Sequence, residues 1–124
     1  MPAEERTLVL IVEDEALVRM HGCDVLESAG FQVLEADTAD EAVALLERHP
    51  GVHLLFSDID MPGSMDGLEL AEIVHSRWPR IGLLLTSGHH RLVDSAIPDN
   101  GLFVPKPWNE DDIVDKLRSI LDTK

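Results

Sequence analysis

Continuous apolar runs, separated by stretches of helical periodicity, are the feature that most limits how this sequence can fold. Such runs are typical of strands buried on both faces, as in parallel sheets covered by helices. The runs are 7–12 (TLVLIV), 53–56 (HLLF), 82–86 (GLLLT) and 102–104 (LFV). The segment 31–36 (FQVLEA) alternates more and is expected nearer an edge of the sheet. The sequence therefore predicts five short strands.

The segments between these runs repeat their apolar residues with the period of an α-helix. Helices are predicted at Glu15–Ala29, Thr38–Arg48, Gly67–Trp78 and Asn109–Leu121. Thr38 and Asn109 are typical N-cap residues, and Gly30 stands where a C-cap glycine belongs. The stretch 87–101 holds one short apolar patch broken by proline and glycine, so we expect a short or irregular fourth helix there.

The alternation of strands with helices of about a dozen residues predicts βαβ units and a parallel α/β sheet. At 124 residues the chain has the size of one compact domain, and we assign residues 1–124 to it. Ligands of such sheets bind at the carboxyl ends of the strands, near the point where the strand order reverses. Polar residues at those ends are therefore the first candidates for a functional site.

Charge and composition exclude several classes of function. The net charge of −14 argues against direct nucleic-acid binding, because phosphate backbones need a basic footprint. No apolar run approaches the roughly 18 residues of a membrane span, and the first residues lack a signal-peptide pattern, so no membrane contact is expected. The single cysteine, Cys23, allows neither an internal disulfide nor a cysteine zinc site. These absences favour a cytoplasmic protein.

Four of the predicted strands end in polar side chains. These are Glu13 and Asp14 after the first strand, Asp58 and Asp60 at the third, Thr86 and Ser87 at the fourth, and Lys106 at the fifth. Converging carboxylates repel one another and require a counter-ion, and oxygen ligands completed by water and phosphate describe a magnesium site. A lysine ammonium and a threonine hydroxyl can hold phosphoryl oxygens, while a carboxylate nucleophile can form an acyl phosphate. The set predicts a site for phosphoryl transfer.

The chain resembles the receiver domain of two-component response regulators along nearly its full length. The resemblance rests on LIVEDE, SDIDMPGSMDGLEL, LTSG and FVPKPW, which occur in the family's order and on the expected strands. It implies a flavodoxin-like, doubly wound (βα)5 sandwich with a five-stranded parallel sheet of order 2-1-3-4-5. It also implies a phosphoacceptor that assists its own phosphorylation and dephosphorylation, and not an enzyme acting on a separate substrate.

The resemblance implies a role for each acidic residue of the site. Asp58 would accept a phosphoryl group from the phosphohistidine of a histidine kinase or a histidine phosphotransfer protein. Asp14, Asp58 and the backbone carbonyl of Asp60 would ligate Mg²⁺ directly, with Mn²⁺ as a substitute. Glu13 would reach the ion through water.

The remaining residues would bind the phosphoryl group and change conformation when it is present. Thr86, Lys106 and the backbone of Ser87 would hold the phosphoryl oxygens, and the peptide bond between Lys106 and Pro107 would be cis. Phosphorylation would draw Thr86 inward and let Phe103 bury itself. This change would alter the face made by the fourth helix, the fifth strand and the last helix, through which a downstream protein would bind. A monomer or a weak dimer through that face is expected.

Departures from the family pattern lie around the same site. The loop DMPGSMDG is one residue longer than the commonest family loop, and the segment 87–101 is short for a fourth helix. Phe103 has no hydroxyl where tyrosine is frequent, and Gly88 lacks a side chain that often shields the acyl phosphate. Trp108, beside Pro107, is expected to pack against the core or to mark a docking surface.

Three alternative hypotheses compete with this interpretation. LLFSDID also resembles the nucleophile motif of haloacid-dehalogenase-type phosphatases, with Asp58 as nucleophile and Asp60 as general acid. Those enzymes carry the motif on their first strand, have Thr or Val where Pro62 stands, and need more chain, which disfavours this alternative. The others are a receiver-fold binding module that acts without phosphorylation and a receiver cut from a hybrid histidine kinase. We predict a single-domain regulator, because the first strand and the last helix leave little chain outside them.

Overall fold

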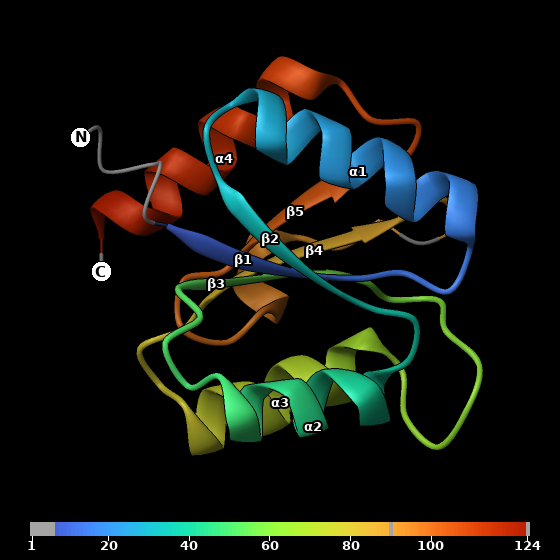
Figure 1. Ribbon diagram of the computed structural model, residues 1–124, viewed down its shortest axis with the longest axis vertical. Helices are drawn as coiled ribbons and strands as arrows, with labels where there is room; N and C mark the ends of the chain where they lie inside the picture. The colour runs from blue at the N-terminus through green and yellow to red at the C-terminus, as the bar shows by residue number, and fades with distance from the viewer. Residues whose placement is uncertain (1–6, 90, 124) are drawn as a thin grey trace.

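A parallel sheet with helices on both sides forms the centre of the molecule in the computed structural model, which describes residues 7–89 and 91–123 (Figure 1). The strands are β1 (Leu8–Val12), β2 (Gln32–Ala36), β3 (Leu54–Asp58), β4 (Gly82–Ser87) and β5 (Leu102–Pro105). All paired strands are parallel and their order is β2-β1-β3-β4-β5, which confirms the predicted sheet and the edge position of β2. The ends of the predicted domain, residues 1–6 and 124, lie outside the described residues.

The helices begin and end within one or two residues of the predicted positions. They are α1 (Ala16–Ser28), α2 (Ala39–Arg48), α3 (Gly67–Arg77) and α4 (Glu110–Asp122). The side chains of Thr38, Asp66 and Asn109 each accept a hydrogen bond from the backbone three residues on, which satisfies a donor that the first turn leaves open. Gly30 adopts φ 97° just after α1, a conformation that glycine reaches without strain. No described helix is both long and apolar enough to cross a membrane.

The connection from β4 to β5 contains one 3-10 turn, η2 (Asp94–Ala96), where a fourth helix would be expected. The short or irregular fourth helix is thus confirmed, and the label α4 belongs to the predicted C-terminal helix. Pro98 cannot continue a helical ladder, and Asp99 and Asn100 both take φ 57°. Asp and Asn tolerate this left-handed conformation better than most residues. The local sequence therefore favours a turn over a helix.

Each side of the sheet has its own apolar core. Alternate strand residues such as Ile11, Phe56 and Leu84 pack with α1 and α4, while Val12, Leu55 and Leu85 pack with α2 and α3. Figure 1 shows α1 and α4 above the sheet and α2 and α3 below it. Because side chains alternate along a strand, the residue two positions beyond each core residue points to the same side. This alternation decides which polar residues meet at the strand ends.

Candidate functional site

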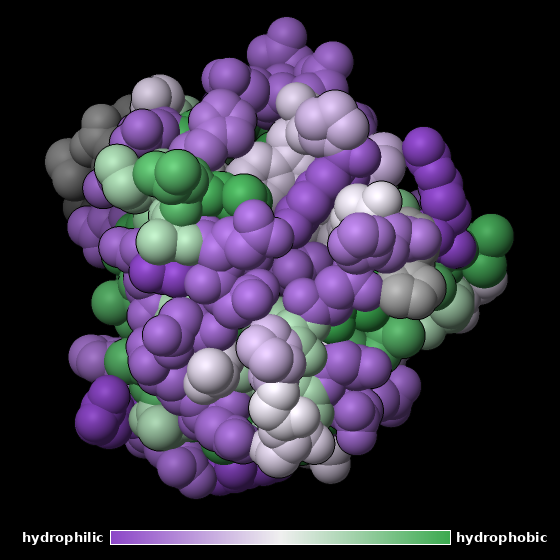
Figure 2. Space-filling model, turned by 90° about the vertical axis from the view of Figure 1, so that its right-hand side faces the viewer, coloured by the Kyte–Doolittle hydropathy of each residue, from purple (hydrophilic) through white to green (hydrophobic). Residues whose placement is uncertain are grey.

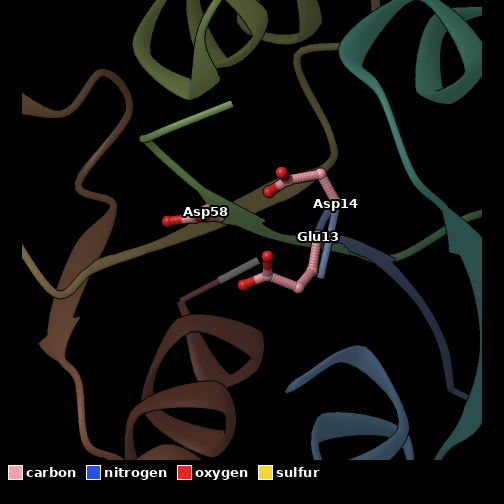
Figure 3. A group of neighbouring side chains, drawn as sticks. All are labelled: Glu13, Asp14 and Asp58. Carbon is pink, nitrogen blue, oxygen red and sulfur yellow. The ribbon is translucent and has the colours of Figure 1, made fainter. Parts of the chain in front are cut away.

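Three carboxylates gather at the carboxyl ends of the neighbouring strands β1 and β3. One ligand atom from each of Glu13, Asp14 and Asp58 lies within 4.8 Å of the other two (Figure 3). Glu13 and Asp58 are buried, at 1% and 3% exposure, whereas Asp14 is exposed. The cluster therefore combines two carboxylates shielded from water with one open to it.

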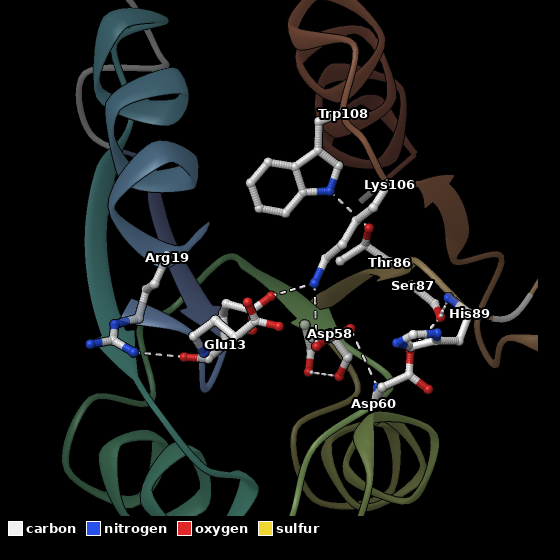
Figure 4. Close-up of polar contacts among 11 residues, drawn as sticks. Glu13, Arg19, Asp58, Asp60, Thr86, Ser87, His89, Lys106 and Trp108 are labelled. Carbon is white, nitrogen blue, oxygen red and sulfur yellow. Dashed lines mark hydrogen bonds and ion pairs between the residues drawn. The ribbon is translucent and has the colours of Figure 1, made fainter. Parts of the chain in front are cut away.

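Lys106, just after β5, supplies the positive charge that faces these carboxylates. Its Nζ lies 2.5 Å from Oε1 of Glu13 and 3.4 Å from Oδ2 of Asp58 (Figure 4). Burial lowers the pKa of Lys106, but the hydrogen bond to Glu13 and the charges of Asp58 and Glu13 outweigh it and raise the pKa above its ordinary value. The ammonium thus stays charged. The Lys106–Pro107 peptide bond that follows is cis.

The Asp58 carboxyl group is perturbed by its surroundings. Burial, and then the negative charge of Glu13, raise its pKa from 3.8 to about 6. The Lys106 ammonium and a hydrogen bond from the Asp60 backbone N–H, 3.3 Å from Oδ1 of Asp58, oppose this rise only in part. One ammonium is therefore shared between two buried carboxylates, and the cluster keeps an excess of negative charge.

This donor set fits a divalent cation. Carboxylate oxygens are hard ligands of the kind that Mg²⁺ prefers, and exposed Asp14 leaves an open side for water. A cation bound among the three groups would relieve the repulsion that raises the Asp58 pKa. Glu13, Asp14 and Asp58, predicted as metal-binding residues, do lie together. The role predicted for the Asp60 carbonyl stays a prediction.

The loop after β3 is held close to the site by α3 and β4. The first residue of α3 is Gly67, where a Cβ atom would lie 2.1 Å from the backbone oxygen of Asp58. Only glycine permits this approach. The Asp60 carboxylate accepts a hydrogen bond from the Ser87 hydroxyl, which in turn accepts one from the His89 backbone N–H at 3.0 Å. Ser87 was predicted through its backbone, and the link from its side chain to Asp60 was missed.

Thr86 lies beside Asp58, since the two residues are paired in register on β4 and β3. Its hydroxyl accepts a hydrogen bond of 2.8 Å from the indole N–H of Trp108 (Figure 4). Thr86 is buried at 2% exposure. The sequence placed Trp108 two residues beyond Lys106 but could not foresee this contact. The predicted switch aromatic, Phe103, belongs to the core on the other side of the sheet and is only 7% exposed.

Arg19 is a further residue that sequence reasoning missed. Its guanidinium donates to the backbone carbonyl of Glu13 at 2.7 Å and to the Glu35 carboxylate at 3.1 Å. It therefore ties the end of β1 to α1 and β2. A single arginine on a helix gives no local signal of such a bridge, because the partners lie on other elements.

The surface over these strand ends is mostly hydrophilic. Figure 2 looks onto this edge and shows hydrophobic groups in its upper left and on its right side. On α1, Leu17 and Met20 are 80% and 60% exposed. A groove of about 590 Å³ is lined by Leu17, Val18 and His21 of α1 and by the Lys106–Trp108 segment. The groove leaves the lysine side of the site open to an approaching molecule.

The family model for the response regulator receiver domain matches residues 9–118. The chain belongs to this family. It is similar to the hydrogenase transcriptional regulatory protein HoxA of Cupriavidus necator, with 32% identity over 98% of this chain and 26% of HoxA. It is also 33% identical to the sensor kinase CckA of Brucella abortus, over 92% of this chain and 12% of the kinase. The chain thus spans about a quarter or less of these relatives.

Solved receiver structures have the same fold. The receiver domain of the hybrid histidine kinase CckA superimposes with a TM-score of 0.79 at 29% identity, covering 92% of this chain and 98% of that one. A CheY-like receiver domain from Methanospirillum hungatei gives a TM-score of 0.83 at 30% identity, covering 94% of both chains. The protein is therefore a receiver domain of the two-component type with the flavodoxin-like arrangement.

Proposed function

We propose that this receiver accepts a phosphoryl group on Asp58, in a Mg²⁺-dependent reaction, from the phosphohistidine of a histidine kinase or a histidine phosphotransfer protein. One observation carries the proposal: the Asp58 carboxylate stands at the end of a buried strand, between other carboxylates and the Lys106 ammonium. Structural acidic clusters are usually exposed, whereas this one holds two carboxylates below 4% exposure. Such an arrangement is costly unless it serves a cation or a phosphoryl group.

The proposed transfer needs little from the protein beyond positioning and charge. An Asp58 oxygen attacks phosphorus, the P–N bond breaks, and the imidazole leaves with its electron pair. Lys106 stabilises the negative charge on the phosphoryl oxygens, and Thr86 and the Ser87 backbone N–H donate to them. Bound Mg²⁺, which Mn²⁺ would replace, supplies further charge neutralisation; Asp14, Asp58 and the Asp60 carbonyl would hold it, and Glu13 would reach it through water.

The protonation state of Asp58 suits this role. A nucleophilic carboxylate must be ionised, and a pKa of about 6 leaves most of the group ionised at neutral pH. A raised pKa also makes the carboxylate more basic than an ordinary aspartate. Because bound Mg²⁺ would lower this pKa, phosphorylation should weaken only at a pH below about 6.

The proposed output is a change in the face formed by η2, β5 and α4. Phosphorylation would draw Thr86 toward the phosphoryl group, and Phe103 would adjust its packing on the neighbouring strand. Since Phe103 is already 7% exposed, its part in the switch is a rearrangement within the core and not a passage from solvent into it. We propose that a downstream protein binds this face. The protein itself would be a monomer, or a weak dimer that associates through the same face.

The same chemistry would serve a single-domain cytoplasmic regulator or the receiver of a hybrid histidine kinase. Both would present the same strand ends to a phosphohistidine. The single-domain form is the one predicted from the sequence. A receiver-fold module that binds partners without phosphorylation is disfavoured by the buried position of Glu13, Asp58 and Thr86.

The experiment that tests the proposal is intact mass spectrometry after incubation with acetyl phosphate, with Mg²⁺, with Mn²⁺ and with neither. We expect one phosphoryl adduct that needs either cation and is absent from Asp58→Asn. Asp111→Asn, an exposed acid on α4, is the matched control and should be labelled like the wild type. An adduct of unchanged yield in Asp58→Asn would contradict the proposal. No adduct, together with no beryllofluoride binding by fluorine NMR, would favour the unphosphorylated module.

A further inference from the structure

The indole of Trp108 packs between α1 and the sheet. Its ring stacks on the His21 ring, with centroids 5.8 Å apart and planes at 18°, and it packs on the Phe56 ring at 5.3 Å. Helix α1 comes close at Gly22, where a Cβ atom would lie 3.3 Å from two carbon atoms of the indole. These contacts hold the ring in one orientation, so the direction of its N–H is set by packing.

The N–H of this ring is directed at Thr86. The distance from Nε1 of Trp108 to Oγ1 of Thr86 is 2.8 Å, and Figure 4 shows the hydroxyl pointing toward the indole. An indole nitrogen can only donate, so the threonine oxygen is the acceptor. Asp58 lies on the adjacent strand, paired in register with Thr86. The hydroxyl is thus engaged on the side of Trp108.

A threonine side chain moves between discrete rotamers, because its branched Cβ makes χ1 stiff. When Oγ1 turns toward a phosphoryl group on Asp58, it must leave the position in which the indole reaches it. The indole uses Oγ1 as an acceptor and a phosphoryl group would use its proton, so the two contacts compete through the position of Oγ1 and not through its hydrogen-bonding capacity. The Lys106 ammonium, the other group proposed to bind the phosphoryl group, lies over the same ring, with Nζ 5.9 Å from its centroid.

The geometry points to Trp108 as a positioning residue that holds the Thr86 hydroxyl turned away from Asp58 until a phosphoryl group arrives. The inference rests on the proposed function, since it concerns how the same site is occupied. Trp108 opposes binding of a phosphoryl group at Asp58 by the free energy of one hydrogen bond. Loss of the indole N–H alone should therefore strengthen binding of a phosphoryl group or its mimic.

The first test follows the two indole N–H signals in a nitrogen–proton NMR spectrum, since Trp78 and Trp108 are the two tryptophans of the chain. Trp78→Phe assigns them. On addition of Mg²⁺ and beryllofluoride, the Trp108 signal should shift as its acceptor departs. The Trp78 signal, at the end of α3, should stay in place. A Trp108 signal that does not move while beryllofluoride binds would overturn the inference.

The second test measures the affinity for beryllofluoride by fluorine NMR. Trp108→Phe keeps an aromatic ring between His21 and Phe56 but loses the N–H. We expect its affinity to rise about three- to tenfold, the effect of one ordinary hydrogen bond. Trp78→Phe is the matched control and should bind like the wild type. Urea unfolding of each variant checks that the fold is kept.

A double-mutant cycle separates the hydrogen bond from a packing effect. Thr86→Val removes the acceptor, so adding Trp108→Phe to it should change the affinity no further, whereas Thr86→Ser should restore the gain. Two outcomes would overturn the inference while leaving the proposed function intact. One is an affinity of Trp108→Phe for beryllofluoride equal to or weaker than that of the wild type. The other is the same gain in affinity when Trp108→Phe is added to Thr86→Val. If neither the wild type nor Trp108→Phe binds beryllofluoride, both the inference and the proposed function fail. Binding by Trp108→Phe alone would support the inference.

Discussion

Both sides of the sheet hold an apolar core, but they differ at the carboxyl ends of the strands. On the side of α1 and α4, the strands end in Asp58, Thr86 and Lys106, which are joined by ion pairs and by the hydrogen bond to Trp108. On the side of α2 and α3, β5 contributes Phe103, whose backbone N–H donates to Asp94 of η2 at 3.0 Å. One side concentrates charge and the other holds an irregular segment.

The difference shows how one strand can serve two purposes. Because neighbouring residues point to opposite sides, β4 and β5 carry the residues proposed to bind the phosphoryl group on one side and apolar core residues on the other. The charged side stores electrostatic repulsion that a cation would relieve. On the irregular side, residues 93–96 are exposed, which makes this segment easier to rearrange. The predictions below test whether the two sides are separable in this way.

The largest expected effect comes from removing the shared cation of the charged side. Lys106→Met leaves Glu13 and Asp58 buried without their ammonium, which should lower the free energy of unfolding by about 2–3 kcal/mol at neutral pH. Mg²⁺ should recover much of this loss, because it binds the folded state and replaces the missing charge. Urea unfolding with and without Mg²⁺ measures both effects.

Lys116→Met is the matched control for this variant. Lys116 pairs with Asp112 at 2.8 Å one turn away on α4, in an ordinary surface pair. Its loss should cost about 0.5 kcal/mol or less and should not respond to Mg²⁺. Equal losses of unfolding free energy in Lys106→Met and Lys116→Met would contradict the claim that electrostatic strain is concentrated on the side of α1 and α4.

A smaller and opposite effect is expected at Asp58. Its folded-state pKa of about 6 lies above its ordinary value of 3.8, so the fold favours the protonated carboxyl. Burial of Asp58 therefore lowers the free energy of unfolding least below about pH 4, where the carboxyl is protonated in both states. The wild type loses stability as the pH rises through 6. Asp58→Asn removes this penalty, and the variant should be about 1–3 kcal/mol more stable than the wild type at pH 7.5.

The pH dependence of this gain is what distinguishes it from a packing effect. The advantage of Asp58→Asn should shrink between pH 7 and 4 and vanish near pH 4, and Mg²⁺ should reduce it at pH 7.5. Urea unfolding across this range, with Asp111→Asn as the control, gives the measurement. A gain that stays constant with pH would refute the electrostatic origin.

The smallest effect is expected on the irregular side. Asp94→Ala removes the acceptor of the Phe103 N–H and should cost about 0.5–1.5 kcal/mol, without changing the affinity for Mg²⁺. Asp94→Asn keeps an acceptor oxygen and should lose less. Urea unfolding and a Mg²⁺ titration of the three proteins make the comparison. A weakened Mg²⁺ affinity in Asp94→Ala would show that the two sides are coupled even without a phosphoryl group.

Much of this molecule could be predicted from local patterns. Continuous apolar runs identified four strands and an alternating segment identified β2, and capping residues such as Thr38 and Asn109 placed helix ends to within one or two residues. The turn chemistry of Pro98 and its neighbours indicated that a regular fourth helix was absent. The meeting of Glu13, Asp14 and Asp58 followed from the rule that parallel strands end at one edge. These features depend on short-range sequence or on topology.

The amino-acid sequence by itself determined which elements form and which side chains reach the strand ends. Tertiary structure alone decided that Lys106 pairs most closely with Glu13, that Ser87 bonds to Asp60, and that Trp108 engages Thr86. The reason is physical. Backbone patterns are set by residues a few positions apart, whereas the rotamer and partner of a side chain depend on the neighbours that packing brings from distant segments.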